Sequence, residues 1–539
     1  MPDDDSPDTS DESQSRRDVL KATGAMTAAG AMGALAGCTG GDGGDGGGDG
    51  GDGGSDGGDG GDGGDGGDGG DGGDGGDGGD GGGSETVQIS YLSAEAAENS
   101  LTTPQFEKSI GRFEEQQGNV EVRLQTASYG DIKQQISSRV SGGNPPTLAE
   151  FGSAGIELWQ NGDVPDHRPW IEASGQFPDG WSDAGRATAE FRGDFWNGSS
   201  MRHSVSNLGI RPKMYSQAGI SDPFEELSTW TGFWEATTAV AEEFPDSFAY
   251  EKTGVFNDLE DYWGEARTGH ENGDDPWIRG DPTDPDLQIG SNPSTDGLIE
   301  HTLALAQEFS SSESASRGDE EIPSLMLTDR VASFTYMTQN FTRWYQTKDD
   351  AVIGWDGGDG DVMLLPNPRL EDPGGLASML NDRGYDYVSR LGEASAGNHG
   401  GHVWALEQAQ GMFAGHSQAE QDAAWALHTF FLTDEQHVLE EYGETYPSIP
   451  NVPEMQQALL DELGDDLPQN FAQVLKNLDE YGAQYNNTGA PWNVWGTDQI
   501  RWTDINETIS QAIAGQIQGS NLVSEVQSRV ETTLSEQNQ

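Results

Sequence analysis

Residues 85–151 decide the fold, and they read ETVQISYLSAEAAENSLTTPQFEKSIGRFEEQQGNVEVRLQTASYGDIKQQISSRVSGGNPPTLAEF. Apolar and polar residues alternate over 87–91 and again over 120–124, which predicts two strands, and residues 148–151 are expected to form a short third one. Between them apolar residues recur at helical spacing, at Phe106, Ile110 and Phe113 and then at Ile132, Ile136 and Val140. The order strand, helix, strand, helix, strand is typical of a parallel, doubly wound α/β sheet.

The ends of these two helices are marked by residues that favour helix starts and stops. Thr103 and Pro104 are expected to be the N-cap and the first helical residue of the first helix, and Gly118-Asn119 ends it. The run Asn144-Pro145-Pro146 stops the second helix, because proline cannot continue one.

The remainder of the chain continues with helical patterns and two irregular stretches. A helix is expected after Thr229-Trp230, and another over 423–431. Isoleucines recur every four residues from 505 to 517, Gly519-Ser520 is expected to break that helix, and apolar spacing resumes at 522. The stretches 264–296 and 354–375 are rich in Gly, Asp, Pro and Asn and are expected to be long loops.

Charge excludes several classes of function. The 539 residues carry a net charge of −67, and the part after residue 84 still carries 74 acidic against 24 basic side chains. Such a polyanion repels phosphates, so a generic DNA or RNA binder is excluded. A single cysteine also excludes a disulfide-stapled scaffold.

The acidic side chains are scattered rather than clustered, and the whole chain has only seven lysines. Molar salt shortens the screening length to about 3 Å and relieves the self-repulsion of such a surface. We therefore expect a halophilic protein adapted to brine. Acidic groups that bind calcium are the alternative.

The first 37 residues have the features of an export signal. Ser15-Arg16-Arg17-Asp18-Val19-Leu20-Lys21 resembles the twin-arginine motif, in which Arg16 and Arg17 are the signature pair. Residues 22–37 are too short and too weakly apolar to span a membrane stably, as expected of a cleaved signal peptide. Residues 35–38, Leu-Ala-Gly-Cys, resemble a lipobox, so Cys38 is expected to become a lipidated N-terminus. A chance cysteine in an Ala/Gly run is the alternative.

Residues 38–84 are expected to be a tether. Positions 40–83 hold 30 Gly, 13 Asp and one Ser. A collagen helix would need proline, and a calcium-binding β-roll would need an apolar residue in each repeat; this segment has neither. A flexible chain of this length reaches roughly 35–40 Å.

Five segments in order resemble the family 1 extracellular solute-binding proteins of ABC importers, the group that includes maltodextrin-binding proteins, here of a haloarchaeal lipoprotein type. The resemblance covers nearly all of residues 85–539. Its segments are the opening helix 106–117, the helix start 227–234, the strand 330–336 with the aromatic Trp344, the helix 423–436, and the C-terminal helices. The chain departs from the family at Arg211-Pro212-Lys213, where Tyr-Asn-Lys is common.

The resemblance implies two doubly wound α/β lobes joined by two or three crossover strands, the periplasmic-binding-protein type II fold, with a ligand cleft between the lobes. Lobe 1 is expected to comprise about 85–205 and 380–432, and lobe 2 about 210–365 and 435–539. It further implies a non-enzymatic protein without cofactor, anchored by lipid at the extracellular face of the cell membrane. Closure of the cleft over a small solute, a carbohydrate foremost, would deliver the solute to ABC permease subunits.

The expected ligand-binding residues suit a sugar, whose flat CH faces stack on aromatic rings and whose hydroxyls need polar partners. By resemblance these residues are Glu95, Phe151, Ser153, Asn207, Tyr262, Trp263, Trp344, Trp492 and Trp495. Core packing is the alternative for each tryptophan, and it is the expectation for Trp230, Trp234 and Trp425, which lie on amphipathic helices.

Motifs of catalysis and metal binding are incomplete. Residues 151–155, Phe-Gly-Ser-Ala-Gly, lack the first glycine of a nucleophile elbow. His399 and His402 lack the glutamate of the zincin motif and are expected in a Gly-rich surface loop. Asp356, Asp359 and Asp361 do not have EF-hand spacing, and a solvated loop is expected there.

Two classes of function stay open at this point. The first is the tethered solute-binding protein. The second is a lipid-anchored, secreted polysaccharide-degrading enzyme, in which aromatic and acidic residues would look similar. Chance pairing among 74 carboxylates prevents the recognition of a catalytic pair from sequence.

Overall fold

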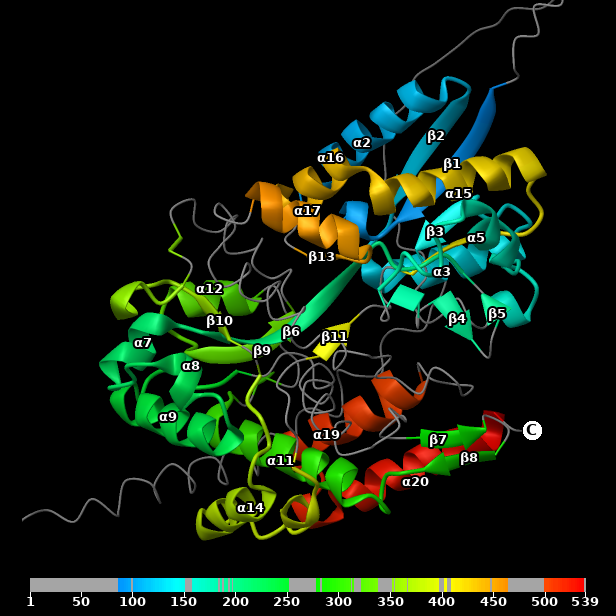
Figure 1. Ribbon diagram of the computed structural model, residues 1–539. Coiled ribbons are helices and arrows are strands. Elements are labelled where there is room, and N and C mark those ends of the chain that lie inside the picture. Colours follow the sequence, from blue (N-terminus) through cyan, green and yellow to red (C-terminus); the bar gives the residue numbers. More distant parts are fainter. Residues whose placement is uncertain are drawn as a thin grey trace, which may run out of the picture. The chain divides into compact units, whose positions relative to one another are not determined.

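The chain divides into two units, residues 1–84 and 85–539, and the computed structural model describes residues of the second unit only. The described residues are 86–97, 100–150, 158–182, 185–186, 189–191, 194–195, 197–251, 278–281, 284–311, 313–314, 321–337, 351–352, 354–365, 367–396, 402–404, 409–445, 448–463 and 499–537. They build two α/β lobes (Figure 1). Each lobe has its own hydrophobic core.

The first lobe is built on a sheet with the strand order β12-β3-β1-β2. Its strands are β1 (Val87–Ser93), β2 (Val120–Thr126), β3 (Leu148–Glu150) and β12 (Gln410–Met412). β1 pairs in parallel with β2, from Val87 opposite Val120 to Ser93 opposite Thr126, and also in parallel with β3. The predicted parallel sheet is therefore confirmed, and β12 adds an antiparallel edge next to β3.

Helices pack on this sheet with the predicted apolar faces inward. Phe106, Ile110 and Phe113 of α2 are buried, and Gly118 ends that helix with a φ of 70°. The helical elements of the lobe are η2 (Glu95–Ala97), α2 (Thr102–Gln117), α3 (Tyr129–Ser141), α5 (Arg168–Ser174), α15 (Gln418–Thr433), α16 (Glu435–Val438), the π-helix η7 (Leu439–Thr445) and α17 (Pro453–Leu463). A short hairpin, β4 (Glu190–Phe191) and β5 (Asp194–Phe195), and the strand β13 (Ile449–Pro450) complete the set.

The predicted N-cap of α2 is wrong by two residues. The helix begins at Thr102, after Leu101, which provides no side-chain cap. The hydroxyls of Thr102 and Thr103 instead donate to the carbonyl of Ala96 in η2. They are therefore used to hold the preceding turn rather than to cap the helix.

The second lobe is organised around β6 (Arg202–Ile210), a strand of nine residues. β9 (Ser333–Met337), β10 (Met363–Leu365), β11 (His402–Trp404) and β13 all pair with β6. Each of these strand pairs is antiparallel. The described parallel strand pairs, β1 with β2 and β1 with β3, belong to the sheet of the first lobe.

Helices surround the second core. They are α7 (Pro212–Gln217), α8 (Pro223–Glu226), α9 (Trp230–Glu243), α11 (Pro293–Phe309), α12 (Ile322–Leu327), η5 (Asp356–Gly358), α14 (Pro373–Asp382), η6 (Leu391–Glu393), the π-helix η8 (Gln499–Ile505), α19 (Asn506–Ile513) and α20 (Gly519–Gln537). The helix expected after Thr229-Trp230 is α9, and Thr229 caps it, because its Oγ1 accepts a hydrogen bond from the Gly232 amide at 3.1 Å.

The chain passes between the two cores three times within the described residues. Met201 belongs to the first core, 208–391 contribute to the second, 409–455 return to the first, and 500–534 end in the second. In Figure 1, β6 accordingly extends from β13 to β9 and β10. The packing differs from the expected lobe boundaries at two places: residues 380–391 pack in the second core, and 438–455 pack in the first.

Three stretches differ from the predicted loops and breaks. Within 264–296, β7 (Ile278–Asp281) and β8 (Asp284–Leu287) form a hairpin and α11 begins. Within 354–375 lie η5, β10 and the start of α14. The break in the isoleucine helix falls at 514–518, with Gly515 at a φ of 74°, and Gly519 begins α20 where a Cβ would lie 2.6 Å from the ring of Tyr387.

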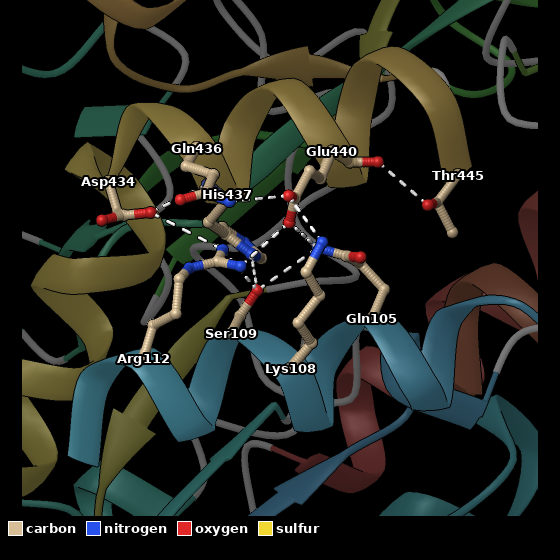
Figure 2. Close-up of polar contacts among 9 residues, drawn as sticks. All are labelled: Gln105, Lys108, Ser109, Arg112, Asp434, Gln436, His437, Glu440 and Thr445. Carbon is tan, nitrogen blue, oxygen red and sulfur yellow. Dashed lines mark hydrogen bonds and ion pairs between the residues drawn. The ribbon is translucent and has the colours of Figure 1, made fainter. Parts of the chain in front are cut away.

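A polar cluster joins α2 to α16 and η7 (Figure 2). The carboxylate of Glu440 accepts hydrogen bonds from Lys108 at 2.6 Å, Gln105 at 2.8 Å, Arg112 at 2.9 Å and Gln436 at 2.8 Å. Burial raises the pKa of Glu440, but these four donors outweigh it and bring the pKa to about 2. The cluster thus fixes η7 against the first helix of the lobe.

Candidate functional site

The candidate site lies at the carboxyl edge of the first sheet. In parallel sheets the carboxyl ends of neighbouring strands meet at one edge, where ligands of open α/β folds bind. β1 ends at Ser93 and β3 at Glu150, and Glu95 follows directly in η2. All three side chains are fully or almost fully buried. We call Glu95, Glu150, Arg202 and Glu441 the buried acid cluster, since Arg202 and Glu441 interact with these carboxylates.

The carboxylate of Glu150 accepts hydrogen bonds from four donors. Its Oε1 accepts from the Tyr91 hydroxyl at 2.5 Å and the Ser93 hydroxyl at 2.6 Å, while its Oε2 accepts from the amides of Ala94 at 2.8 Å and Glu95 at 2.9 Å. Burial raises the pKa of Glu150, and the four hydrogen bonds oppose that rise. The carboxylate thereby ties the end of β3 to the turn that follows β1.

Arg202 connects this edge to the crossover strand. It is the first residue of β6, it is fully buried, and its Nε donates to Glu95 Oε1 at 2.6 Å. Its Nη1 donates to the Ser448 hydroxyl at 3.2 Å, just before β13 pairs with the start of β6. The guanidinium therefore links η2, β6 and the segment before β13.

A chain of buried side chains extends from Glu150 to helix α15. Gln410 Nε2 donates to the Tyr91 hydroxyl at 2.6 Å, and the Gln410 Oε1 accepts from His428 Nδ1 at 2.9 Å. Burial lowers the pKa of His428 to about 3, so its imidazole is neutral. The Nδ1 proton is required by the amide oxygen, which fixes the tautomer.

Two of the predicted binding residues lie in the described part of the chain. Glu95 is at the carboxyl edge of the first sheet, with its carboxylate bound by Arg202. Asn207 lies in β6, where its backbone pairs with Tyr336. The other predicted site residues lie outside the described residues: Arg16, Arg17, Cys38, Phe151, Ser153, Tyr262, Trp263, Trp344, Trp492 and Trp495.

The prediction of core packing for three tryptophans is confirmed. Trp230 and Trp234 are at most 2% exposed in the second core, and Trp425 is 8% exposed in the first. Trp234 Nε1 donates to His301 Nε2 at 2.6 Å, so its polar atom is satisfied inside the core.

Two predictions for surface loops are wrong in part. Asp361 is buried, and its carboxylate binds Arg211 Nη1 at 2.7 Å, whereas Asp356 and Asp359 are exposed as expected. His402 lies in β11, paired with Ser206 of β6, while His399 is outside the described residues. Within the described ranges, no group of three or more His, Cys, Asp or Glu side chains is arranged to hold a metal ion.

The sequence reasoning missed Arg202, Glu150 and Glu441 as members of a site. Glu150 had a usable signal, because it is the one charged residue at the end of an otherwise apolar strand. Arg202 and Glu441 had none, since their partners come from segments more than 100 residues away in the chain.

Residues 13–33 match the family model described as the TAT (twin-arginine translocation) pathway signal sequence. The matched range contains Arg16 and Arg17, so the predicted export signal is confirmed and the chain is expected outside the cytoplasm.

No curated protein matches the chain by sequence. Among the described helices, none is both long enough and apolar enough to cross a membrane.

The fold is the two-lobe type II fold of periplasmic binding proteins. The chain is similar to an ABC substrate-binding protein from Listeria monocytogenes in complex with cycloalternan, with 14% identity, a TM-score of 0.58, and coverage of 84% of this chain and 100% of that chain. It is also similar to the sugar-binding protein MalE from Xanthomonas citri, with 14% identity, a TM-score of 0.61, and coverage of 84% and 98%. A third similar structure is UgpB from Mycobacterium tuberculosis in complex with glycerophosphocholine, with 14% identity, a TM-score of 0.60, and coverage of 84% of this chain and 99% of that chain. At this level of identity the likeness establishes the fold.

Proposed function

We propose that this protein is an extracellular solute-binding protein that captures a carbohydrate and delivers it to an ABC import permease without changing it covalently. The observation that carries the proposal is that 84% of this chain matches in fold almost the whole length of solute-binding chains. The twin-arginine signal supports a place of action outside the cytoplasm.

The connections between the lobes suit a closing movement. β6 begins with Arg202 in the first lobe and ends with Ile210 in the second core, and the chain crosses between the cores twice more. A few connecting segments can absorb the dihedral changes of a hinge while each core stays intact. A solute that contacts both lobes would shift the population towards the closed form by its extra affinity for that form.

A carbohydrate is the favoured solute class. Neighbours in fold were solved with cycloalternan, maltose and α-D-tagatose, which are all sugars. We propose that Trp344, Tyr262, Trp263, Trp492 and Trp495 supply stacking faces, and that Glu95, Phe151, Ser153 and Asn207 border the solute from the first lobe and the crossover strand. The glycerophosphocholine bound by UgpB represents a second solute class. The low number of basic residues, 24 after residue 84, disfavours a phosphate for this chain.

The N-terminal segment completes the proposal. Cleavage before Cys38 and lipidation of its thiol would anchor the chain, and residues 38–84 would let the binding domain turn freely within roughly 35–40 Å of the membrane. The net charge of −67 supports work in concentrated salt, where screening removes the self-repulsion.

The test is a titration of the exported domain in molar KCl. Maltose, longer glucose oligosaccharides and tagatose are added while tryptophan fluorescence and binding heat are followed, and the same mixtures are assayed for new reducing ends. Saturable binding without new reducing ends is expected. Turnover of an oligosaccharide or polysaccharide would instead support the secreted, lipid-anchored degrading enzyme. Binding of glycerophosphodiesters alone would move the solute class to phosphates.

A further inference from the structure

Glu441 carries a carboxyl group that is buried, and the described part of the chain gives it no hydrogen-bond donor. Its side chain is 0% exposed. Neither of its carboxylate oxygens has a hydrogen-bond partner among the described residues. It lies in the π-helix η7, next to Glu440, whose carboxylate has four donors from α2 and α16. Adjacent glutamates in one helix therefore have opposite environments.

The charged groups that face Glu441 are mostly of its own sign. Glu95 of η2 and Glu150 of β3 interact with it repulsively, and Arg202 of β6 is the cation near it. Arg202 is already bound to Glu95 at 2.6 Å. His437 of α16 is neutral, because burial lowers its pKa to about 3, and the α2 cations Lys108 and Arg112 pair with Glu440 instead.

The protonation states of the cluster follow from its donors. Glu150 has four donors and Glu95 has the guanidinium, whereas Glu441 has no donor among the described residues. An ionised Glu441 would add a negative charge that has no hydrogen-bond donor, in a site closed to water. Burying an ionised carboxylate without partners costs far more than burying the neutral acid, so the group keeps its proton.

We propose that Glu441 is protonated in the folded protein at neutral pH, and that loss of this proton at alkaline pH loosens the contact between the first lobe and the start of β6. The second part follows from the position of Arg202. A charged Glu441 competes with Glu95 for the same guanidinium, which also holds Ser448 before β13. Arg202 and His203 are the residues of β6 that pair with β13.

Two further observations support this proposal. Burial, followed by the charges of Glu95 and Glu150, raises the pKa of Glu441 well above its ordinary value of 4.5. The neighbouring Tyr442 is also fully buried, and burial raises the pKa of its phenol, so no second anion forms there near neutrality.

The sign of the pH effect is fixed by this shift. A folded-state pKa above the unfolded value gives a stability contribution that is complete below pH 4.5 and is lost as pH rises through the folded-state pKa. The wild-type midpoint of thermal unfolding should therefore fall as pH rises above 4.5 and level off above the folded-state pKa, and Glu441→Gln, which mimics the neutral acid, should weaken that fall.

The experiment compares wild type, Glu441→Gln and the matched control Glu150→Gln by thermal unfolding in molar KCl from pH 4.5 to pH 10. We expect Glu441→Gln to equal wild type at pH 4.5 and to exceed it by several degrees at pH 10. Glu150→Gln should be less stable than wild type throughout, because an amide nitrogen cannot accept from the donors that Glu150 binds. At pH 10, amide exchange at residues 202, 203 and 449 should be faster in wild type than in Glu441→Gln.

Infrared titration supplies a readout that does not depend on stability. The carbonyl band of protonated carboxyl groups should be stronger in wild type at pH 7 than in Glu441→Gln, while Glu300, whose pKa burial raises to about 7, contributes to the band in both proteins. Bands of equal strength in wild type and Glu441→Gln would overturn the proposal. An equal loss of stability by Glu441→Gln at pH 4.5 and pH 10 would overturn it as well, since a group that keeps its proton in the folded protein gives a difference that grows with pH.

Discussion

Arg202 Nε donates a hydrogen bond to Glu95 Oε1 at 2.6 Å, and both side chains are completely buried. The pair joins the turn after β1 to the first residue of the strand that enters the second lobe. A polar link at this place has a cost of desolvation, which the mutual attraction and the Ser448 hydroxyl offset. The pair holds the start of β6 against η2 and against the segment before β13.

Removal of one partner of this pair should strongly destabilise the protein. Arg202→Met leaves the carboxylate of Glu95 buried near two other carboxyl groups, so we expect a loss of about 3–5 kcal/mol in the free energy of unfolding. Denaturant titration at constant molar KCl measures it. Glu525→Gln is the matched control, because it breaks the exposed Arg529–Glu525 pair and should change stability by less than about 1 kcal/mol. Equal effects of both variants would contradict the importance of burial.

Glu440 should make the protein sensitive to acid (Figure 2). Its folded-state pKa of about 2 lies below the ordinary 4.5, so its stabilising contribution is present above pH 4.5 and is lost as pH falls towards 2. Glu440→Gln should lose about 1.5–3 kcal/mol at neutral pH, because charge-assisted hydrogen bonds become neutral ones.

The measurement for Glu440 is the free energy of unfolding as a function of pH. The difference between wild type and Glu440→Gln should shrink as pH falls from 4.5. Glu462→Gln, an exposed substitution on α17, serves as the control and should follow wild type at every pH. A difference that does not vary with pH would mean that the variant acts through packing alone.

Two glycines within helices should respond oppositely to alanine. A Cβ at Gly111 of α2 meets nothing within 4 Å, so Gly111→Ala should stabilise by about 0.5–1 kcal/mol through the helix propensity of alanine. A Cβ at Gly297 of α11 would lie 2.5 Å from Leu391 Cα and 2.8 Å from its amide nitrogen. Gly297→Ala should therefore destabilise by about 1–3 kcal/mol. Thermal unfolding checks both, and destabilisation by Gly111→Ala would contradict the open space there.

The parallel sheet could be predicted because its signals are local. Val87, Ile89 and Tyr91 alternate within seven residues, and Gly118 ends the following helix with a left-handed backbone that glycine adopts easily. The N-cap of α2 could not be predicted, since the threonine hydroxyls are used by Ala96 in a turn that has no local pattern. The hairpin at 278–287 was hidden because its strands are rich in Asp, Gly and Pro.

The candidate site was harder to predict than the fold. The position of Glu95 after the first strand was sufficient to place it at the carboxyl edge. Its partner Arg202 is 107 residues away, and Glu441 belongs to a segment that the expected lobe boundaries assigned to the other half. Which carboxyl groups are buried together depends on the assembled fold. The composition, with 74 acidic residues scattered after residue 84, does not indicate which of them these are.

Trp344 provides the sharpest test of the proposed sugar site. Stacking of an aromatic ring on a sugar face is expected to supply at least about 1.4 kcal/mol, so Trp344→Ala should weaken binding of the best sugar by tenfold or more. Calorimetric titration in molar KCl measures the affinity, and thermal unfolding shows that the variant is folded. Trp170→Ala is the control, because Trp170 is half-buried in α5, donates to Asp422 at 2.8 Å, and is not among the proposed binding residues. It should bind the sugar as wild type does. A folded Trp344→Ala that keeps wild-type affinity would remove this residue from the site, because no stacking ring can be lost without a loss of binding.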